Sequence, residues 1–263
     1  MDELRSRALS ALRIAGPGDR CAAVAVLASF GGAVDTGAVL VEPPGIPGRP
    51  ERPLLVPPGS VARRAVGTRD GRAALLHALA HIEFNAIGLA LDHVWRFAGL
   101  PEEYYRDWVG VAVEEAHHFA LLRGRLQQAG HDYGDFPAHD GLWEMARRTA
   151  DDALARMALV PRTLEARGLD ASPAVRAKFV AVGDFESARI IDVILRDEIG
   201  HVAVGNRWFR FLCDRRGLNP EGTDREVAQR CQAPRQRGPF NVEARLQAGF
   251  TAQEVDELQR SAR

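Results

Sequence analysis

Two short stretches decide the fold: Glu114–His118 reads EEAHH, and Asp197–His201 reads DEIGH. Each stretch contains Glu-x-x-His, with a second acid directly before the glutamate. Residues three apart lie on the same face of an α-helix, so each stretch would hold a carboxylate beside an imidazole. Both side chains of such a pair can bind the same cation, and the repetition of the pair indicates a metal site built on helices.

Helical phase predicts which of these side chains point inward. At steps of three and four, one apolar stripe contains Trp108, Val111, Glu115, His118, Leu122 and Leu126. The neighbouring pair, Glu114 and His117, shares its face with two glycines, which make a poorer core. We therefore expect Glu115 and His118 to be buried.

Two further segments have the same kind of stripe. One contains Ile191, Ile194, Glu198, His201, Gly205, Trp208 and Leu212, and the other contains Leu76, Ala80, Glu83, Ile87, Ala90 and Val94. A buried ionised carboxylate is costly unless it is paired, protonated or bound to a metal. Several carboxylates at one level of a bundle therefore predict bound cations.

A dinuclear site in a four-helix bundle needs one more acid, from the long segment between about Asp140 and Gly168. The candidates are Glu144, Asp151, Asp152 and Glu165, and spacing favours Glu165. Glu83 precedes Glu115 by 32 residues, and Glu165 precedes Glu198 by 33. The predicted metal ligands are Glu83, Glu115, His118, Glu165, Glu198 and His201.

The acids that precede the two motifs, Glu114 and Asp197, have two interpretations. They accept the ring N–H of a ligand histidine from a partner helix, or they are solvated acids on the helix flank. Small residues near the stripes, such as Ala80, Ala86, Ala90 and Gly205, either leave room for a pocket or allow close helix packing. Both pairs of alternatives stay open at this point.

Helix start and stop signals organise the rest of the chain. They predict long helices from about Thr68 to Phe97, from Pro101 to Gly130, from Asp140 to Gly168, and from Ser172 to Gly217 with an interruption at Gly183-Asp184. No segment alternates with period two. We predict an all-α protein in which residues 68–217 form an antiparallel four-helix bundle.

The flanking regions differ from this bundle. Residues 1–67 read as short N-terminal helices followed by a proline-rich segment at 41–59, which is either a strap on a surface or a linker. Residues 218–263 read as a tail that packs on the bundle and ends in a short helix, with a capping box at Thr251 and Glu254.

Composition excludes several classes of function. The 263 residues carry a net charge of −1, which gives no electrostatic reason to bind nucleic acid or an anionic membrane. Three cysteines without Cys-x-x-Cys spacing favour neither disulfides nor a thiolate metal site. No apolar run approaches the length of a membrane span, so we expect a cytoplasmic protein, with a homodimer as one possible assembly.

The chain resembles the ferritin-like di-iron carboxylate superfamily and, more closely, the ferritin-like family called domain of unknown function 455. The strings that carry this resemblance are HALAHIEFNAIGLALD, YGDFPAHDGLW, RMALVPRTLEARGLD, RDEIGHVAVGNRWF and GPFNVEARLQAGF, between residues 77 and 250. The resemblance implies the ferritin-like four-helix fold and the same six ligands. It also implies an acid where this chain has Gly88, a departure that removes an outer contact and no ligand.

The resemblance and the ligand set favour an O2-dependent oxidase or hydroxylase with two iron ions, or one manganese and one iron. Its partners would be a small-molecule or carrier-bound substrate and an electron donor. The alternatives are an iron-handling or peroxide-detoxifying protein, a tRNA-modifying hydroxylase, and a bundle in which metal has only a structural role. Catalytic residues beyond the metal centre are not predicted.

Overall fold

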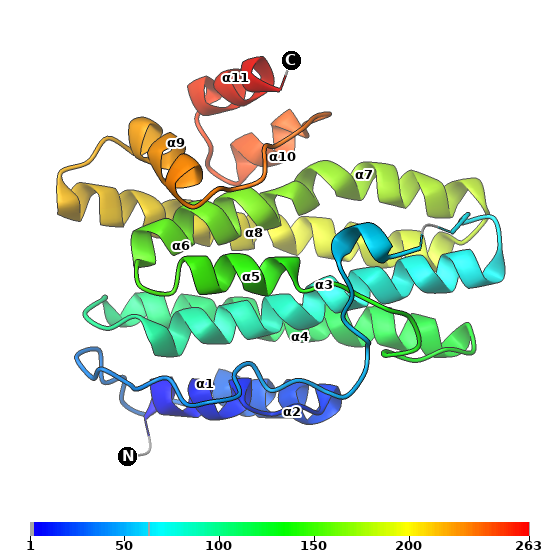
Figure 1. The fold of residues 1–263 in the computed structure, drawn as a ribbon, viewed down its shortest axis with the longest axis horizontal. Helices are drawn as coiled ribbons and strands as arrows, with labels where there is room; N and C mark the ends of the chain where they lie inside the picture. Colours follow the sequence, from blue (N-terminus) through cyan, green and yellow to red (C-terminus); the bar gives the residue numbers. More distant parts are fainter. Residues whose placement is uncertain (1–2, 63, 263) are drawn as a thin grey trace. The chain divides into compact units, whose positions relative to one another are not determined.

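The computed structural model describes residues 3–62 and 64–262, and within these ranges the chain is helical with no β-strand. An isolated parallel bridge joins Leu55 and Ala138. The all-α class predicted from the sequence is therefore confirmed. The chain divides into two compact units, Met1–Gly141 and Leu142–Arg263 (Figure 1).

The first unit is built on an antiparallel hairpin of two long helices. Its elements are α1 (Leu4–Leu12), α2 (Pro17–Ala28), the short 3₁₀ helix η1 (Pro58–Ser60), α3 (Arg69–Arg96) and α4 (Glu102–Gln128). Helices α3 and α4 pack against each other, α1 packs on α3, and α2 packs on α4 (Figure 1). Both long helices have the predicted bounds to within two residues. Thr68 caps α3 by accepting a hydrogen bond from the Gly71 N–H, and Gly130 follows α4 with a φ of 82°.

The proline-rich segment is tied to the first unit by hydrogen bonds. The Gly48 N–H donates to the Leu12 carbonyl at 2.9 Å, and the Val56 N–H donates to the Ala138 carbonyl at 2.8 Å. Arg49 forms a 2.6 Å ion pair with Asp140. Of the two interpretations, a strap laid on a surface describes this segment better than a linker.

The second unit contains the helices from α5 onward. They are α5 (Gly141–Arg148, whose first residue closes the first unit), α6 (Ala153–Leu159), the π-helix η2 (Val160–Glu165), α7 (Ala166–Ala181), α8 (Phe185–Arg216), α9 (Pro220–Arg230), α10 (Val242–Gln247) and α11 (Ala252–Ser261). Helices α7 and α8 form a second antiparallel hairpin, α10 packs on both, and α9 packs on α6 and α8. The predicted capping box at Thr251 and Glu254 is present on α11.

The predicted interruption at Gly183-Asp184 and the predicted end at Gly217 are confirmed, whereas the predicted end of the third helix at Gly168 and the predicted start of the fourth at Ser172 were wrong. Helix structure breaks between α5 and α6, where Asp152 caps α6, and it then continues from α6 through η2 to the end of α7. The true boundary lies at Gly183 (φ 74°) and Asp184, which caps α8 through the Ser187 N–H. Gly183 and Asp184 are ordinary stop and start signals, whereas Ser172-Pro173, the predicted start of the fourth helix, lies inside α7.

Pro173 lies inside α7 because other parts of the chain compensate for its missing N–H. A proline at this position leaves the carbonyl of residue 169 without its helical donor. The side-chain amide of Asn241 donates to the Leu169 carbonyl at 3.2 Å. Ser172 Oγ also donates to the Gly168 carbonyl at 2.7 Å. The helix therefore passes through Ser172 and Pro173.

The π-helix η2 contains Pro161, which removes one backbone hydrogen bond from the helix. Thr163 Oγ1 donates to the Ala158 carbonyl at 2.9 Å within this irregular turn. A Cβ added to Gly205 of α8 would lie 2.6 Å from Pro161 Cγ. Gly205 thus allows η2 and α8 to approach closely, and at this position close packing rather than a pocket is the correct alternative.

Helix α3 is long and apolar enough to span a membrane by length and composition, contrary to the expectation that no run approaches that length. It is the one such helix within the described residues, and 72% of its most apolar window is buried inside the protein. This burial is typical of the core helix of a soluble protein, and the compartment stays a prediction.

Candidate metal centre

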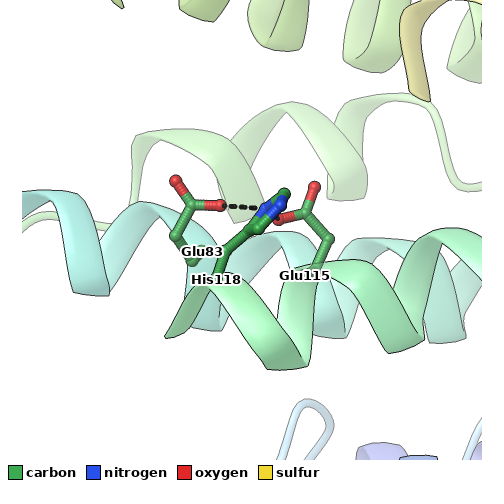
Figure 2. Close-up of side chains that lie close together, drawn as sticks. All are labelled: Glu83, Glu115 and His118. Carbon is green, nitrogen blue, oxygen red and sulfur yellow. Dashed lines mark ion pairs between the residues drawn. The ribbon is translucent and has the colours of Figure 1, made fainter. Parts of the chain in front are cut away.

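Three side chains converge inside the first unit (Figure 2). Glu83 reaches from α3, while Glu115 and His118 reach from α4, and the three are 6%, 1% and 0% exposed. His118 Nδ1 lies 3.4 Å from Glu115 Oε2 and 3.5 Å from Glu83 Oε2. One ligand atom from each residue lies within 4.8 Å of the other two. This set is called the first-unit triad below.

The electrostatics of the triad follow from its burial. Burial raises the pKa of Glu83 well above its ordinary value, and the neighbouring Glu115 charge raises it further. Burial alone would lower the pKa of His118, but its contacts with Glu115 and Glu83 outweigh this effect and raise the pKa to about 10. Without a cation, a proton on His118 offsets part of the carboxylate charge. A bound cation would replace that proton, because a ligand imidazole is neutral.

The apolar stripe on α4 explains why these residues are inside. Every member of the predicted stripe is buried, whereas Glu114 and His117 are exposed. A phase shift of one residue would have turned the alternative pair inward. The packing of α4 against α3 therefore places Glu115 and His118 next to Glu83.

The second unit holds the other Glu-x-x-His pair. Glu198 and His201 are 7% and 1% exposed, and His201 Nδ1 lies 3.2 Å from Glu198 Oε2. The predicted stripe of α8 is buried along its whole length. One turn of α8 thus carries a carboxylate and an imidazole on its buried face.

The acid predicted to accompany this pair lies at the end of the π-helix. Glu165 is half-buried, and the next helical turn brings Gly168 against Glu198. A Cβ at Gly168 would lie 3.6 Å from Glu198 Oε1, so the Glu198 carboxylate lies over the turn that follows Glu165.

The three competing acids have other surroundings. Glu144 and Asp151 are exposed. Asp152 caps α6 and accepts hydrogen bonds from Arg216 at 2.9 Å and Arg230 at 3.2 Å. Among the four candidates, Glu165 is the one that directly precedes the turn against Glu198, and its role as a ligand stays a prediction.

The two acids that precede the motifs lie outside the buried stripes of α4 and α8. Asp197 is half-buried and accepts hydrogen bonds from Arg196, at 2.7 Å to Oδ1 and 3.0 Å to Oδ2. Glu114 lies on the exposed face of α4. A role in orienting His118 or His201 stays a hypothesis for both.

The donor atoms fit a first-row divalent metal. The first-unit triad offers carboxylate oxygens and an imidazole nitrogen, and the second unit offers the same kinds of atom. Such mixed oxygen and nitrogen donors suit iron or manganese better than a metal selected by thiolates. The three cysteines lie outside both groups of predicted ligands, and each is free. The first-unit triad can therefore hold a metal ion, and the identity of the metal stays a proposal.

Sequence reasoning missed the buried arginines. Arg5, Arg20, Arg156 and Arg245 are at most 2% exposed, and Arg5 donates to the carbonyls of Val94 and Trp95. In sequence they look like the exposed residues of an arginine-rich chain. No periodic signal distinguishes them, and the partners of Arg5 and Arg245 at Val94 and Asp170 lie 89 and 75 residues away along the chain.

Comparison with known proteins identifies the family. The chain belongs to a family of proteins of unknown function, DUF455, whose model matches residues 20–256. An uncharacterized protein of Haemophilus influenzae is 50% identical over 214 residues, which cover 79% of this chain and 74% of that protein. No solved structure matches the chain. All six predicted ligands lie within the range that the family model matches.

Proposed function

We propose that this protein is a non-haem dinuclear metal carboxylate protein that acts as an O2-dependent oxidase or hydroxylase on an organic substrate. Its cofactor would be two iron ions, or one manganese and one iron. The observation that carries the proposal is the buried first-unit triad of Glu83, Glu115 and His118. Two carboxylates at 6% and 1% exposure are costly in a folded protein without a cation to balance them.

The second part of the proposal is that the centre is dinuclear. In the first unit a hairpin carries Glu83 on one helix and Glu115 with His118 on the other. In the second unit η2 carries Glu165, and α8 carries Glu198 with His201. One carboxylate and one Glu-x-x-His pair per unit is the ligand pattern of a dinuclear carboxylate site in a four-helix bundle. We propose that the two hairpins, α3–α4 and α7–α8, are the halves of a ferritin-like bundle and that all six residues bind one pair of ions.

The residues around the predicted ligands suit a site that keeps water out. Apolar side chains precede and follow the ligands on each stripe, including Val111 and Leu122 on α4 and Ile194 and Trp208 on α8. Their burial limits the access of water, and their packing keeps the helices that carry the ligands in place. When bound, the two metal ions would supply the capacity to reduce dioxygen, which protein side chains do not have. The chain itself would bind and orient the ions and exclude solvent.

Anaerobic reconstitution with Fe(II) tests this function. Protein freed of metal is loaded with excess Fe(II), passed through a desalting column and analysed for iron, and its optical spectrum is recorded on exposure to O2. The expected result is saturation near two irons per chain and a spectral change that needs O2. Manganese loaded with iron in equal amounts tests the mixed centre in the same way.

The same titration separates the alternatives. Uptake of tens of irons per chain, in an assembly of many subunits by light scattering, would overturn the oxidase proposal in favour of iron storage. Two bound irons that consume H2O2 but do not react with O2 would favour peroxide detoxification. Two irons that bind without redox change would leave a structural metal. A tRNA substrate would show as binding to total tRNA that salt weakens steeply.

A further inference from the structure

The second unit contains a cavity whose lining includes none of the predicted ligands. Its volume is 660 Å³, and its walls come from η2, α9, α10, α11 and the chain segments that join α9 to α10 and α10 to α11. This volume lies within the range of about 300–1,000 Å³ that is typical of small-molecule sites. Ala228, Pro234, Phe250, Val255 and Leu258 supply an apolar lining.

Arg245 lines this cavity and has an unused donor. It is 0% exposed, and its Nε and Nη2 donate to the Asp170 carboxylate at 3.0 and 2.7 Å. Nη2 also donates to Gln236 Oε1 at 3.0 Å. Within the described residues, Nη1 is buried and has no hydrogen-bond partner. A buried donor left in this state destabilises the protein, so an acceptor from a ligand would stabilise it.

A second buried arginine lies on the same lining. Arg162 is 2% exposed, and its Nη2 donates to Glu254 Oε1 at 2.7 Å. Its Nε lies 3.5 Å from Asp224 Oδ1, which is too long for a hydrogen bond, and neither atom has another partner in the described chain. The guanidinium carbons of Arg162 and Arg245 lie 4.9 and 5.2 Å from the centre of the Phe250 ring.

Charged side chains of both signs line the cavity, with one more arginine than acid, and Asp170, which does not line it, pairs with Arg245. Five arginines and four acids line it: Arg162, Arg225, Arg235, Arg245 and Arg260, and Glu221, Asp224, Glu254 and Glu257.

Three of the acids already have partners, and the fourth, Asp224, lies 3.5 Å from Arg162 Nε. Glu254 accepts from Arg162 and Arg210, Glu221 accepts from Gln253 at 2.8 Å, and Glu257 lies 3.8 Å from Arg225. By contrast, the described bonds of Arg235 and Arg260 go to main-chain carbonyls, those of Ser261 and Asp256.

We propose that this cavity binds a small organic carboxylate with an apolar body. The carboxylate would accept from Arg245 Nη1 and lie near Arg235 and Arg260, and the apolar body would lie along Phe250, Val255 and Leu258. A guanidinium matches a carboxylate in shape and charge, and the apolar wall adds burial that a bare inorganic anion cannot use. The site is separate from the predicted metal ligands and does not depend on the proposed oxidase activity.

Calorimetric titration of the full chain with four probes tests both halves of the proposal. Hexanoate has the charge and the apolar body, acetate has only the charge, hexan-1-ol has only the body, and inorganic phosphate is an anion without a body. Hexanoate is expected to bind one site per chain with a Kd below about 1 mM. The other three probes are expected to bind at least about tenfold more weakly.

Two variants locate the site. Leu258→Glu places a negative charge on the apolar wall, and its matched control, Gln259→Glu, places the same charge on the exposed face of the same helix. Leu258→Glu should weaken hexanoate binding at least about tenfold, and Gln259→Glu should leave it unchanged within about twofold. Arg245→Lys keeps a cation for Asp170 but removes Nη1, and it should also weaken binding about tenfold.

Three outcomes would overturn the proposal. They are no hexanoate binding to the wild-type chain, equal hexanoate affinity in the Leu258→Glu and Gln259→Glu variants, and phosphate binding as tight as hexanoate. If Arg245→Lys does not fold, the comparison of positions 258 and 259 still decides. The hexanoate titration does not measure metal binding, so its outcome would stand even if the proposed metal centre proved wrong.

Discussion

Replacing Gly205 with Ala tests how closely α8 approaches the π-helix that ends at Glu165. A Cβ at position 205 would lie 2.6 Å from Pro161 Cγ, roughly 1 Å inside the normal carbon contact distance of about 3.5 Å. Pro161 is a rigid ring in a buried turn, so it cannot rotate away. Overpacking of this kind typically costs about 1–3 kcal/mol.

Gly200 supplies the matched control on the same helix. It is exposed, and a Cβ there meets no atom within 4 Å. Because glycine inside a helix is less stable than alanine by about 0.5–1 kcal/mol, Gly200→Ala should leave the protein equally stable or slightly more stable. Gly205→Ala should lower the free energy of unfolding and reduce Tm by about 2–10 °C, given a few degrees per kcal/mol for a chain of this size.

Thermal and urea unfolding of the two metal-free variants gives the comparison. Iron titration then tests the effect on the site, because displacement of η2 also displaces Glu165. We expect Gly205→Ala to bind iron at least about tenfold more weakly than Gly200→Ala. Equal stability of the two variants would refute the close approach of α8 to Pro161 on which this reasoning rests.

Three further predictions follow from particular contacts. Removal of metal by a chelator should lower the wild-type Tm by about 5–10 °C, because a metal at a hundred times its Kd adds about 2.7 kcal/mol of stability. In paired melts with and without chelator, the decrease in Tm should be smaller for a Glu198→Ala/His201→Ala variant. Burial and the nearby His81 lower the pKa of His77 to about 4, against an opposing effect of Asp135, so the unfolded chain binds the proton first as pH falls. The stabilisation that depends on neutral His77 should therefore be complete above about pH 6.5 and be lost between about pH 6.5 and 4. In urea titrations across that range, the free energy of unfolding should change less steeply with pH for His77→Gln than for the wild type. An unchanged pH dependence would contradict the assignment. Asn241→Ala should lower the free energy of unfolding by about 1–2 kcal/mol because the Leu169 carbonyl loses its donor. In the Pro173→Ala background the loss should be smaller, since the new N–H of residue 173 replaces that donor. Additive losses in the double-mutant cycle would rule out this compensation.

The parts of the fold that were predictable are those governed by local rules. The stripes of α3, α4 and α8 follow from a 3.6-residue period, and the structure buries all their members, including Glu83, Glu115 and His201. The starts of α3 and α11 follow from Thr68 and Thr251 as capping residues. Each of these features depends on residues within a few positions of one another.

The features that were not predictable depend on distant partners. Helix α7 passes through Pro173 because Asn241 lies against it, and those two residues are far apart in sequence. The π-helix at Pro161 depends on a glycine at position 205 of another helix. The buried state of Arg245 depends on Asp170 and Gln236, so it had no signal in the local pattern.

The central claim is that the buried Glu and His side chains of α4 hold metal, and a comparison of two double variants tests it most directly. Glu115→Ala/His118→Ala removes the buried pair, whereas Glu114→Ala/His117→Ala removes the exposed pair of the same residue types one position earlier. Iron per chain is counted after identical anaerobic loading and desalting. We expect about two irons in the exposed-pair variant and at most about one in the buried-pair variant. Full loading of the buried-pair variant would contradict the account.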